Sequence, residues 1–107
     1  MNIAPNHTQI PNYFLDEVMY DLSNAELKCL LYICRRTFGF HKRADRISLS
    51  QFENGIKTTD ENGEDRILDR GTGLTRKPII KALKSLEKRG LIKCTCGKTK
   101  KYELIIS

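Results

Sequence analysis

Apolar residues recur along this chain with two different periods, and the change of period separates predicted helices from predicted strands. The first ten residues are polar, contain Pro5 and are expected to form a flexible N-terminal arm. A short first helix is then predicted from Pro11 to Asp21 or Ser23. Its apolar residues, which have helical spacing, are Phe14, Leu15, Val18 and Leu22.

A second helix is predicted to begin at Ser23, because Ser23 and Glu26 have the spacing of a capping box. Gly39 is expected to end it, since glycine commonly follows the last helical turn. Cys29 falls well away from the apolar stripe of this helix, so Cys29 and Cys34 would not face one another as metal ligands. The stripe consists of Leu27, Leu30, Leu31, Cys34 and Phe38.

A second capping box, Ser48 with Gln51, predicts a short third helix that carries Leu49 and Phe52 and stops near Gly55. The following residues, 56–69, contain Asn62-Gly63 between segments able to extend, which predicts a β-hairpin with a two-residue turn. The acidic tip does not have the glycine and glutamate spacing of a calcium loop. We therefore expect a solvated turn there.

The longest helix is predicted to be capped by Thr75 and to end at Gly90, with Pro78 in its first turn. On a helical wheel the apolar residues and the lysines separate onto two sides. One side carries Ile79, Ile80, Leu83 and Leu86, and the other carries Lys77, Lys81, Lys84 and Lys88.

The last segment alternates with period two and predicts two strands joined by a loop of Gly97, Lys98 and Thr99. This register pairs Ile92 with Leu104, Cys94 with Tyr102 and Cys96 with Lys100. Cys94 and Cys96 are then expected to pack as small apolar groups. The outward face would carry Lys93, Thr95, Lys101 and Glu103.

The order of these elements predicts a mainly helical α+β fold with a C-terminal β-hairpin, namely a winged helix-turn-helix. We expect one domain over 11–107 after the arm at 1–10. Within it, an insertion spans 56–72, the recognition helix spans 75–89 and the wing spans 91–106.

The net charge of +6 is concentrated in the last third of the chain. Residues 76–101 hold ten cations against Glu87, whereas the rest of the chain has more acids than cations. Clustered cations favour a polyanionic partner, because binding then releases many counterions. Double-stranded DNA is the predicted partner.

The recognition helix and the wing supply most of the candidate DNA-binding residues. Thr75, Arg76, Lys77 and Lys81 are expected near base edges, Lys84 and Lys88 at the backbone, and Lys98 and Lys100 on a neighbouring strand. The alternative is an ordinary solvated face, but such a face usually mixes charges of both signs. A transcription regulator or a protein-protein adaptor with this fold also stays open.

A second basic stretch, residues 35–48, joins the second and third predicted helices. Phe38 and Phe40 are expected to close the end of the core there. The cations either contact phosphates or pair internally with Asp45 or with acids of the first helix, and the sequence leaves both open. These four cations are Arg35, Arg36, Lys42 and Arg43, and the fifth cation of the stretch, Arg46, is expected to lock the turn together with Asp45.

Other chemistry finds little support in the sequence. The four cysteines lack zinc-ligand spacing and are expected to be reduced thiols. Neither His7 nor His41 belongs to a catalytic arrangement, so we expect no enzyme activity, cofactor or metal. No apolar stretch has transmembrane length, which predicts a soluble intracellular protein without a membrane partner.

The run LSNAELKCLLYICRRTFGFHKRADRISLSQF, followed by GLTRKPIIKALKSLEKRGLI, resembles the N-terminal domain of phage replication protein O, the replisome organiser family. The resemblance covers about residues 8–92. It implies binding to repeats of a phage replication origin in double-stranded DNA to initiate DNA replication, with a homodimer as a possible form, in the cytoplasm of a bacterial host cell. Helicase-loading or replisome proteins would be recruited through a further region, which we expect to lie outside this chain.

Overall fold

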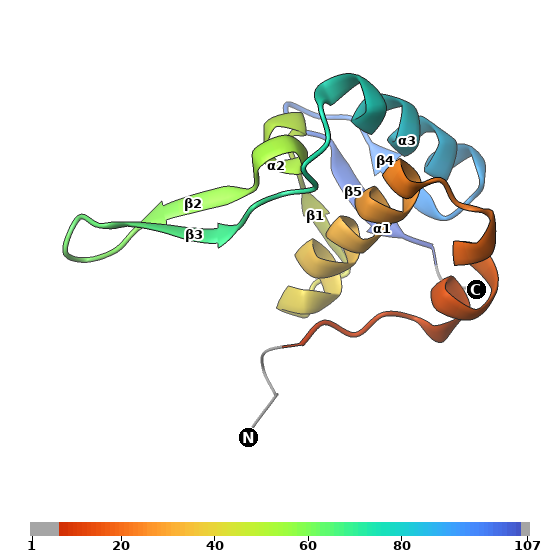
Figure 1. Cartoon of the computed structure of the whole chain (residues 1–107), viewed down its shortest axis with the longest axis horizontal. Helices are drawn as coiled ribbons and strands as arrows, with labels where there is room; N and C mark the ends of the chain where they lie inside the picture. The colour runs from red at the N-terminus through yellow and green to blue at the C-terminus, as the bar shows by residue number, and fades with distance from the viewer. Residues whose placement is uncertain (1–6, 106–107) are drawn as a thin grey trace.

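In the computed structural model, which describes residues 7–105, helices α1 and α3 pack against each other and against a three-stranded antiparallel sheet (Figure 1). A two-stranded sheet projects from this body. The fold is therefore mixed α+β. The elements in chain order are η1 (Phe14–Val18), η2 (Met19–Asp21), α1 (Asn24–Thr37), η3 (Phe38–Phe40), β1 (Ala44–Arg46), α2 (Leu49–Asn54), β2 (Ile56–Thr59), β3 (Asp65–Asp69), α3 (Arg76–Lys88), β4 (Ile92–Thr95) and β5 (Lys101–Leu104).

The segment before α1 is helical, as predicted, but it is not one regular helix. It consists of the π-helix η1 followed by the 3-10 turn η2, which ends at Asp21. Phe14 is its only buried residue and packs into the core. Of the predicted arm, residues 1–6 lie outside the described residues, and residues 7–10 form no helix or strand.

Helix α1 begins as predicted, because both hydrogen bonds of the Ser23–Glu26 capping box are present. Its end differs from the prediction. The helix stops at Thr37 and continues as the turn η3, after which His41 takes the left-handed conformation expected of a glycine. Gly39 has another role: a Cβ atom there would lie 2.7 Å from Nη1 of Arg35.

Helix α1 is buried on more of its sides than the single predicted apolar stripe covers. Cys29 is fully buried together with Cys34, although the sequence placed Cys29 off the stripe. Leu31, a predicted stripe residue, is partly exposed instead. The reason is that α1 contacts α3 and also strands β1 and β5, so several of its sides are covered. Within this core the buried ring of Phe52 contacts Tyr32 in a tilted arrangement and Tyr102 edge-on.

The sheet has the order β1-β5-β4, so β5 is its central strand. The predicted register of β4 and β5 is confirmed, with Ile92 opposite Leu104 and Cys94 opposite Tyr102. Strand β1 was not predicted, because its three residues Ala-Asp-Arg show no alternation. It pairs with β5, and therefore Lys101 and Glu103 are half-buried instead of facing solvent.

Helix α2 confirms its prediction, with the Ser48–Gln51 capping box at its start and Gly55 after its last residue. Helix α3 also has the predicted extent and is followed by Gly90 in the left-handed conformation. The predicted capping bond of Thr75 is absent: Thr75 occupies the N-cap position, but its side chain accepts no hydrogen bond from the helix.

Strands β2 and β3 form the predicted hairpin, which extends away from the rest of the molecule (Figure 1). Its turn differs from the two-residue prediction. Asp60 donates its backbone N–H to the carbonyl of Glu64 and accepts backbone N–H groups of Asn62 and Glu64 on its carboxylate. The loop therefore contains three residues, and Gly63 supplies the positive φ it requires.

Candidate nucleic-acid interface

Four lysines form a row on the side of α3 that faces away from the core. The core side is fixed by Ile79, Ala82, Leu83 and Leu86, which are buried against α1 and the sheet. The lysines opposite are exposed, and none of their side chains forms an ion pair or hydrogen bond with any other residue in 7–105. This lysine row consists of Lys77, Lys81, Lys84 and Lys88.

The first residue of α3 is held differently from the lysine row. Arg76 lies next to α2, where its Nε donates to Oε1 of Glu53 at 2.8 Å. The pair is more than half exposed on the arginine side, so it orients Arg76 without burying it. Thr75 precedes it and is exposed.

A groove of about 590 Å³ runs beside the lysine row, between α3, the start of α2 and the loop that joins β4 to β5. Its apolar lining includes Ile80, Leu83 and Tyr102, and Ile80 stays partly exposed because it lines this groove instead of the core. Four cations and one acid, Glu87, also line it; the cations are Arg76, Lys84, Lys98 and Lys100. The groove therefore combines an apolar lining with positive charge.

Arg46 and Ile47 hold the β4–β5 loop in place. Nη1 of Arg46 donates to the carbonyl of Thr99 at 2.7 Å, and the backbone N–H of Ile47 donates to the carbonyl of Lys100. These bonds fix the loop on which Lys98 and Lys100 are exposed. Sequence reasoning assigned Arg46 only to its own turn and missed this role.

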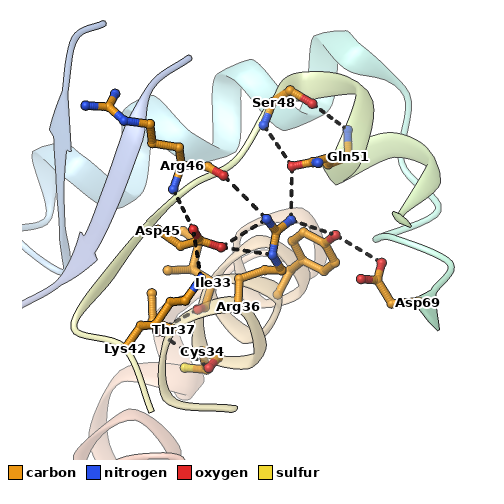
Figure 2. Close-up of polar contacts among 11 residues, drawn as sticks. Ile33, Cys34, Arg36, Thr37, Lys42, Asp45, Arg46, Ser48, Gln51 and Asp69 are labelled. Carbon is orange, nitrogen blue, oxygen red and sulfur yellow. Dashed lines mark hydrogen bonds and ion pairs between the residues drawn. The ribbon is translucent and has the colours of Figure 1, made fainter. Parts of the chain in front are cut away.

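Arg36, a predicted DNA contact, is buried and cannot reach a ligand. The residue is 7% exposed, and its guanidinium donates to the carboxylate of Asp45, with nitrogen–oxygen distances of 3.1 and 3.0 Å (Figure 2). It also donates to Oε1 of Gln51 at 3.1 Å, and more weakly to Tyr32 and to the carbonyl of Arg46. Of the two alternatives left open for this arginine, internal pairing with Asp45 is the one observed.

The Arg36 network connects α1, β1 and the start of α2, and it continues to the base of the β2–β3 hairpin (Figure 2). Gln51 accepts from Arg36 and from the backbone of Ser48, so the network orients the α2 N-terminus that lines the groove. Tyr32 donates its hydroxyl to Asp69 at 3.0 Å, and Asp69 also accepts from the backbone of Gly71. This arginine therefore positions the elements around the groove.

The other cations of the basic stretch are exposed but lie at the far end of α1, which points away from α3 (Figure 1). The Arg35 guanidinium lies 4.5 Å from the centre of the Phe40 ring. Lys42 and Arg43 pair loosely with Asp45 and Glu103, at 3.7 and 3.8 Å. The structure therefore separates them from the α3 lysines.

Phe38 packs partly against the core as predicted, whereas Phe40 is 47% exposed and does not close its end. The reason is that Phe40 lies beyond the last turn of α1, where its ring stacks on Arg35. Ser48, Ser50 and Ile80 line the groove but were not predicted as site residues. The capping box of α2 was the available signal for Ser48.

The cysteines are all free thiols, as predicted. Burial raises the pKa of both Cys29 and Cys34 to about 12, which keeps these thiols protonated. Cys94 packs against the core, but Cys96 is exposed, contrary to the prediction, because it follows the last paired residue of β4. Within 7–105, no cluster of His, Cys, Asp and Glu side chains is placed to hold a metal ion.

None of the helices in 7–105 has the length and apolar character needed to cross a membrane.

Comparison with known proteins gives one family. Searches of curated proteins and of solved structures found no match. The model of the family described as bacteriophage replication protein O, however, matches residues 2–104, which is nearly the whole chain. The chain therefore belongs to the bacteriophage replication protein O family.

Proposed function

We propose that this chain binds double-stranded DNA at a phage replication origin and so contributes to the initiation of replication. Membership of the family supports a role in phage replication. The observation that carries the DNA-binding proposal is the lysine row of α3, which is exposed and has no acidic partner within 7–105. Such a row suits a ligand with closely spaced negative charges, because each phosphate it neutralises releases counterions.

We infer a winged helix-turn-helix from the order of the elements. Helix α2, a connection containing glycine, and the longer basic helix α3 are followed directly by the β4–β5 hairpin, and this is the order of that fold. The loop of the β4–β5 hairpin then corresponds to the wing. It forms one wall of the cationic groove, which supports its use as a second DNA contact beside α3.

In this proposal α3 enters the major groove and the wing follows the backbone. Thr75, Lys77 and Lys81 are near base edges, as is Arg76 once it leaves Glu53. Lys84 and Lys88 contact phosphates beside them, and Lys98 and Lys100 contact the adjoining strand. Arg35, Lys42 and Arg43 are left out of this interface, because they lie at the other end of α1. Recruitment of helicase-loading or replisome proteins is assigned to a region outside this chain.

The direct test reverses two charges of the lysine row. We expect Lys77→Glu with Lys81→Glu to weaken binding to duplex DNA by about 100-fold or more at moderate salt, because two attractive contacts become repulsive. Fluorescence anisotropy with a labelled duplex measures the affinity, and circular dichroism checks that the fold is retained.

Lys28→Glu with Lys93→Glu is the matched control. It makes the same change in net charge at exposed positions on α1 and β4, outside the proposed interface. We expect it to weaken binding far less than the α3 variant. Equal weakening by both variants would mean that total charge, not the lysine row, determines binding.

Origin recognition needs a separate test. Duplexes selected from random DNA by the wild-type protein are compared with repeated sequences in the genome that encodes it. We expect the recovered motif to match repeats clustered at one locus. Recovery of no common motif would overturn sequence-specific binding.

A further inference from the structure

A second cationic surface lies where α1 ends, at the turn η3 and the residues that lead from it into β1 (Figure 1). The DNA-binding proposal does not use it, because it lies at the end of α1 away from α3. At its centre is Phe40, an aromatic side chain that is 47% exposed. Two exposed cations lie over its ring, and a third follows in the sequence. This η3 surface consists of Arg35, Phe40, Lys42 and Arg43.

The chain turns tightly to bring these side chains together. His41 takes the left-handed conformation, with φ 57° and ψ 35°, which residues other than glycine adopt only at an energetic cost. The backbone N–H of Lys42 then donates to the carbonyl of Thr37 at 2.8 Å. Gly39 leaves the space that the Arg35 guanidinium occupies, because a Cβ atom there would lie 2.7 Å from Nη1. The turn therefore holds the aromatic ring and the cations together.

The cations over Phe40 leave part of this residue free. The Cζ atom of Arg35 lies 4.5 Å from the centre of the ring, and Nζ of Lys42 lies 6.0 Å from it, both within the range of cation–π attraction. With both cations in place, nearly half of Phe40 is still exposed. The surface therefore presents an aromatic ring to solvent between positive charges.

The η3 surface also keeps a net positive charge. Arg35 forms no ion pair with any residue in 7–105. Lys42 lies 3.7 Å from Asp45, whose carboxylate is already bound by the buried Arg36 at 3.0 Å. The side chain of Arg43 is 91% exposed and pairs only at 3.8 Å. Such long, exposed ion pairs contribute little, so an anionic ligand can replace them.

We propose that the η3 surface binds single-stranded DNA. A base stacks on the exposed part of Phe40, and the three cations contact the phosphates on either side of it. Aromatic rings beside cations are the means by which proteins bind single strands without reading their sequence. The family's role in phage replication makes DNA the expected strand. The inference does not rest on the lysine row, because that row lies on a different part of the molecule.

Other anionic partners match only part of this surface. In duplex DNA the bases are paired and stacked on one another, so their faces do not reach an aromatic side chain. Acidic peptides and anionic lipid headgroups supply negative charge but no base to stack. An unpaired strand supplies both a free base and closely spaced phosphates.

The test uses tryptophan as a local reporter, because the chain contains none. Phe40→Trp places the only indole of the full chain on the η3 surface, where a stacked base quenches its fluorescence. Every protein titrated with the single strand also carries Lys77→Glu with Lys81→Glu, so that the lysine row does not compete for it. The ligand is an oligothymidylate of about 12 nucleotides, which has no paired bases.

We expect saturable quenching of the Phe40→Trp protein. Adding Lys42→Glu with Arg43→Glu should weaken its affinity by about tenfold or more, because two cations beside the strand become acids. Tyr20→Trp replaces Phe40→Trp in a control for random collisions, since Tyr20 lies on η2 and is 92% exposed. We expect no saturable quenching there.

Two further variants separate charge from stacking. Lys57→Glu with Arg70→Glu makes the same change in charge as the Lys42 and Arg43 variant, at exposed positions near the β2–β3 hairpin, and should weaken binding far less. Phe40→Ala should weaken binding of a labelled oligothymidylate several-fold, as measured by anisotropy. With the lysine row intact, Phe40→Ala should leave the affinity for duplex DNA unchanged. Circular dichroism checks the fold of each variant.

Three outcomes would overturn the proposal. The first is no saturable quenching of the Phe40→Trp protein, and the second is an unchanged single-strand affinity of the Phe40→Ala protein. The third is equal quenching by a duplex of the same length, by polyglutamate or by phosphatidylglycerol vesicles, because the surface would then recognise charge alone. Duplex binding that survives the lysine-row substitutions would contradict the proposed function and leave this inference standing.

Discussion

Burial at the level of single residues decides which cations of this protein are available to a ligand. Arg35 and Arg36 are neighbours in the sequence, yet Arg35 stacks on Phe40 at the surface while Arg36 is buried against Asp45. A buried charge requires hydrogen-bonding partners, and Arg36 has them on four other residues. Its role is therefore to join elements of the fold.

Glu26 leads to a prediction about pH at the same scale. Burial raises the pKa of this carboxyl, but hydrogen bonds from the Ser23 backbone, Ser85 and Arg89 outweigh burial and lower its pKa. A lowered pKa stabilises the fold above the pKa of the unfolded carboxyl, about 4.3, and this contribution is lost as pH falls through the folded value.

Glu26→Gln should therefore reduce the free energy of unfolding by about 1 to 2 kcal/mol at pH 7, because charged hydrogen bonds to Ser85 and Arg89 become neutral. The difference from wild type should shrink as the pH falls from the unfolded pKa of about 4.3 through the lowered folded pKa, because wild-type Glu26 then becomes protonated itself. Urea unfolding at several pH values measures it. A difference that stays constant down to pH 3 would contradict a role for the ionised carboxylate.

At the scale of elements, the β2–β3 hairpin is attached to the rest of the molecule through contacts at its base. Asp69 accepts from Tyr32 and Gly71, and Thr72 donates both its N–H and its hydroxyl to the carbonyl of Phe52. Gly55 allows close approach there, since a Cβ atom at this position would collide with the Asp69 backbone. The strands beyond this base are solvated.

Replacing residues 58–66 by a short turn should therefore change the melting temperature by only a few degrees. Asp69→Ala, in contrast, should cost about 1 to 3 kcal/mol, because the Tyr32 hydroxyl loses its acceptor in a partly buried site. Thermal unfolding followed by circular dichroism compares the two variants. A larger loss from the shortened hairpin than from Asp69→Ala would show that the strands themselves support the core.

At the scale of the whole molecule, the groove exists only because three separate segments meet. The start of α2, the outer side of α3 and the β4–β5 loop come together through the Arg36 network and through the Arg46 bond to Thr99. Lys98 and Lys100 thus lie across the groove from Lys84. In the proposed function, this arrangement would place cations on both sides of a bound DNA strand.

Lys98→Ala with Lys100→Ala should weaken binding to all duplexes by a similar factor. The slope of log affinity against log salt should fall by about 2, because two phosphate contacts are lost and no base contact is. Anisotropy titrations at several salt concentrations, with a selected and a scrambled duplex, measure both effects. Weakening confined to the selected duplex would instead assign these lysines to base recognition.

The sequence by itself determined the features that depend on neighbouring residues. Both serine capping boxes, the β4–β5 register and the two sides of α3 follow from spacing within one element, and all are present. Local hydrogen bonds and periodicity are sufficient to specify such features. The family resemblance, carried by residues 22–52 and 73–92, was also correct.

Tertiary structure alone decided which elements cover each residue. Strand β1 forms because β5 offers a free edge, Cys29 is buried because α1 is enclosed, and Arg36 is paired because Asp45 returns to it from the next strand. In each case the residues in contact come from different elements, and the path of the chain between those elements decides whether they meet. Spacing within an element cannot specify such contacts, because they arise only when separate elements pack together.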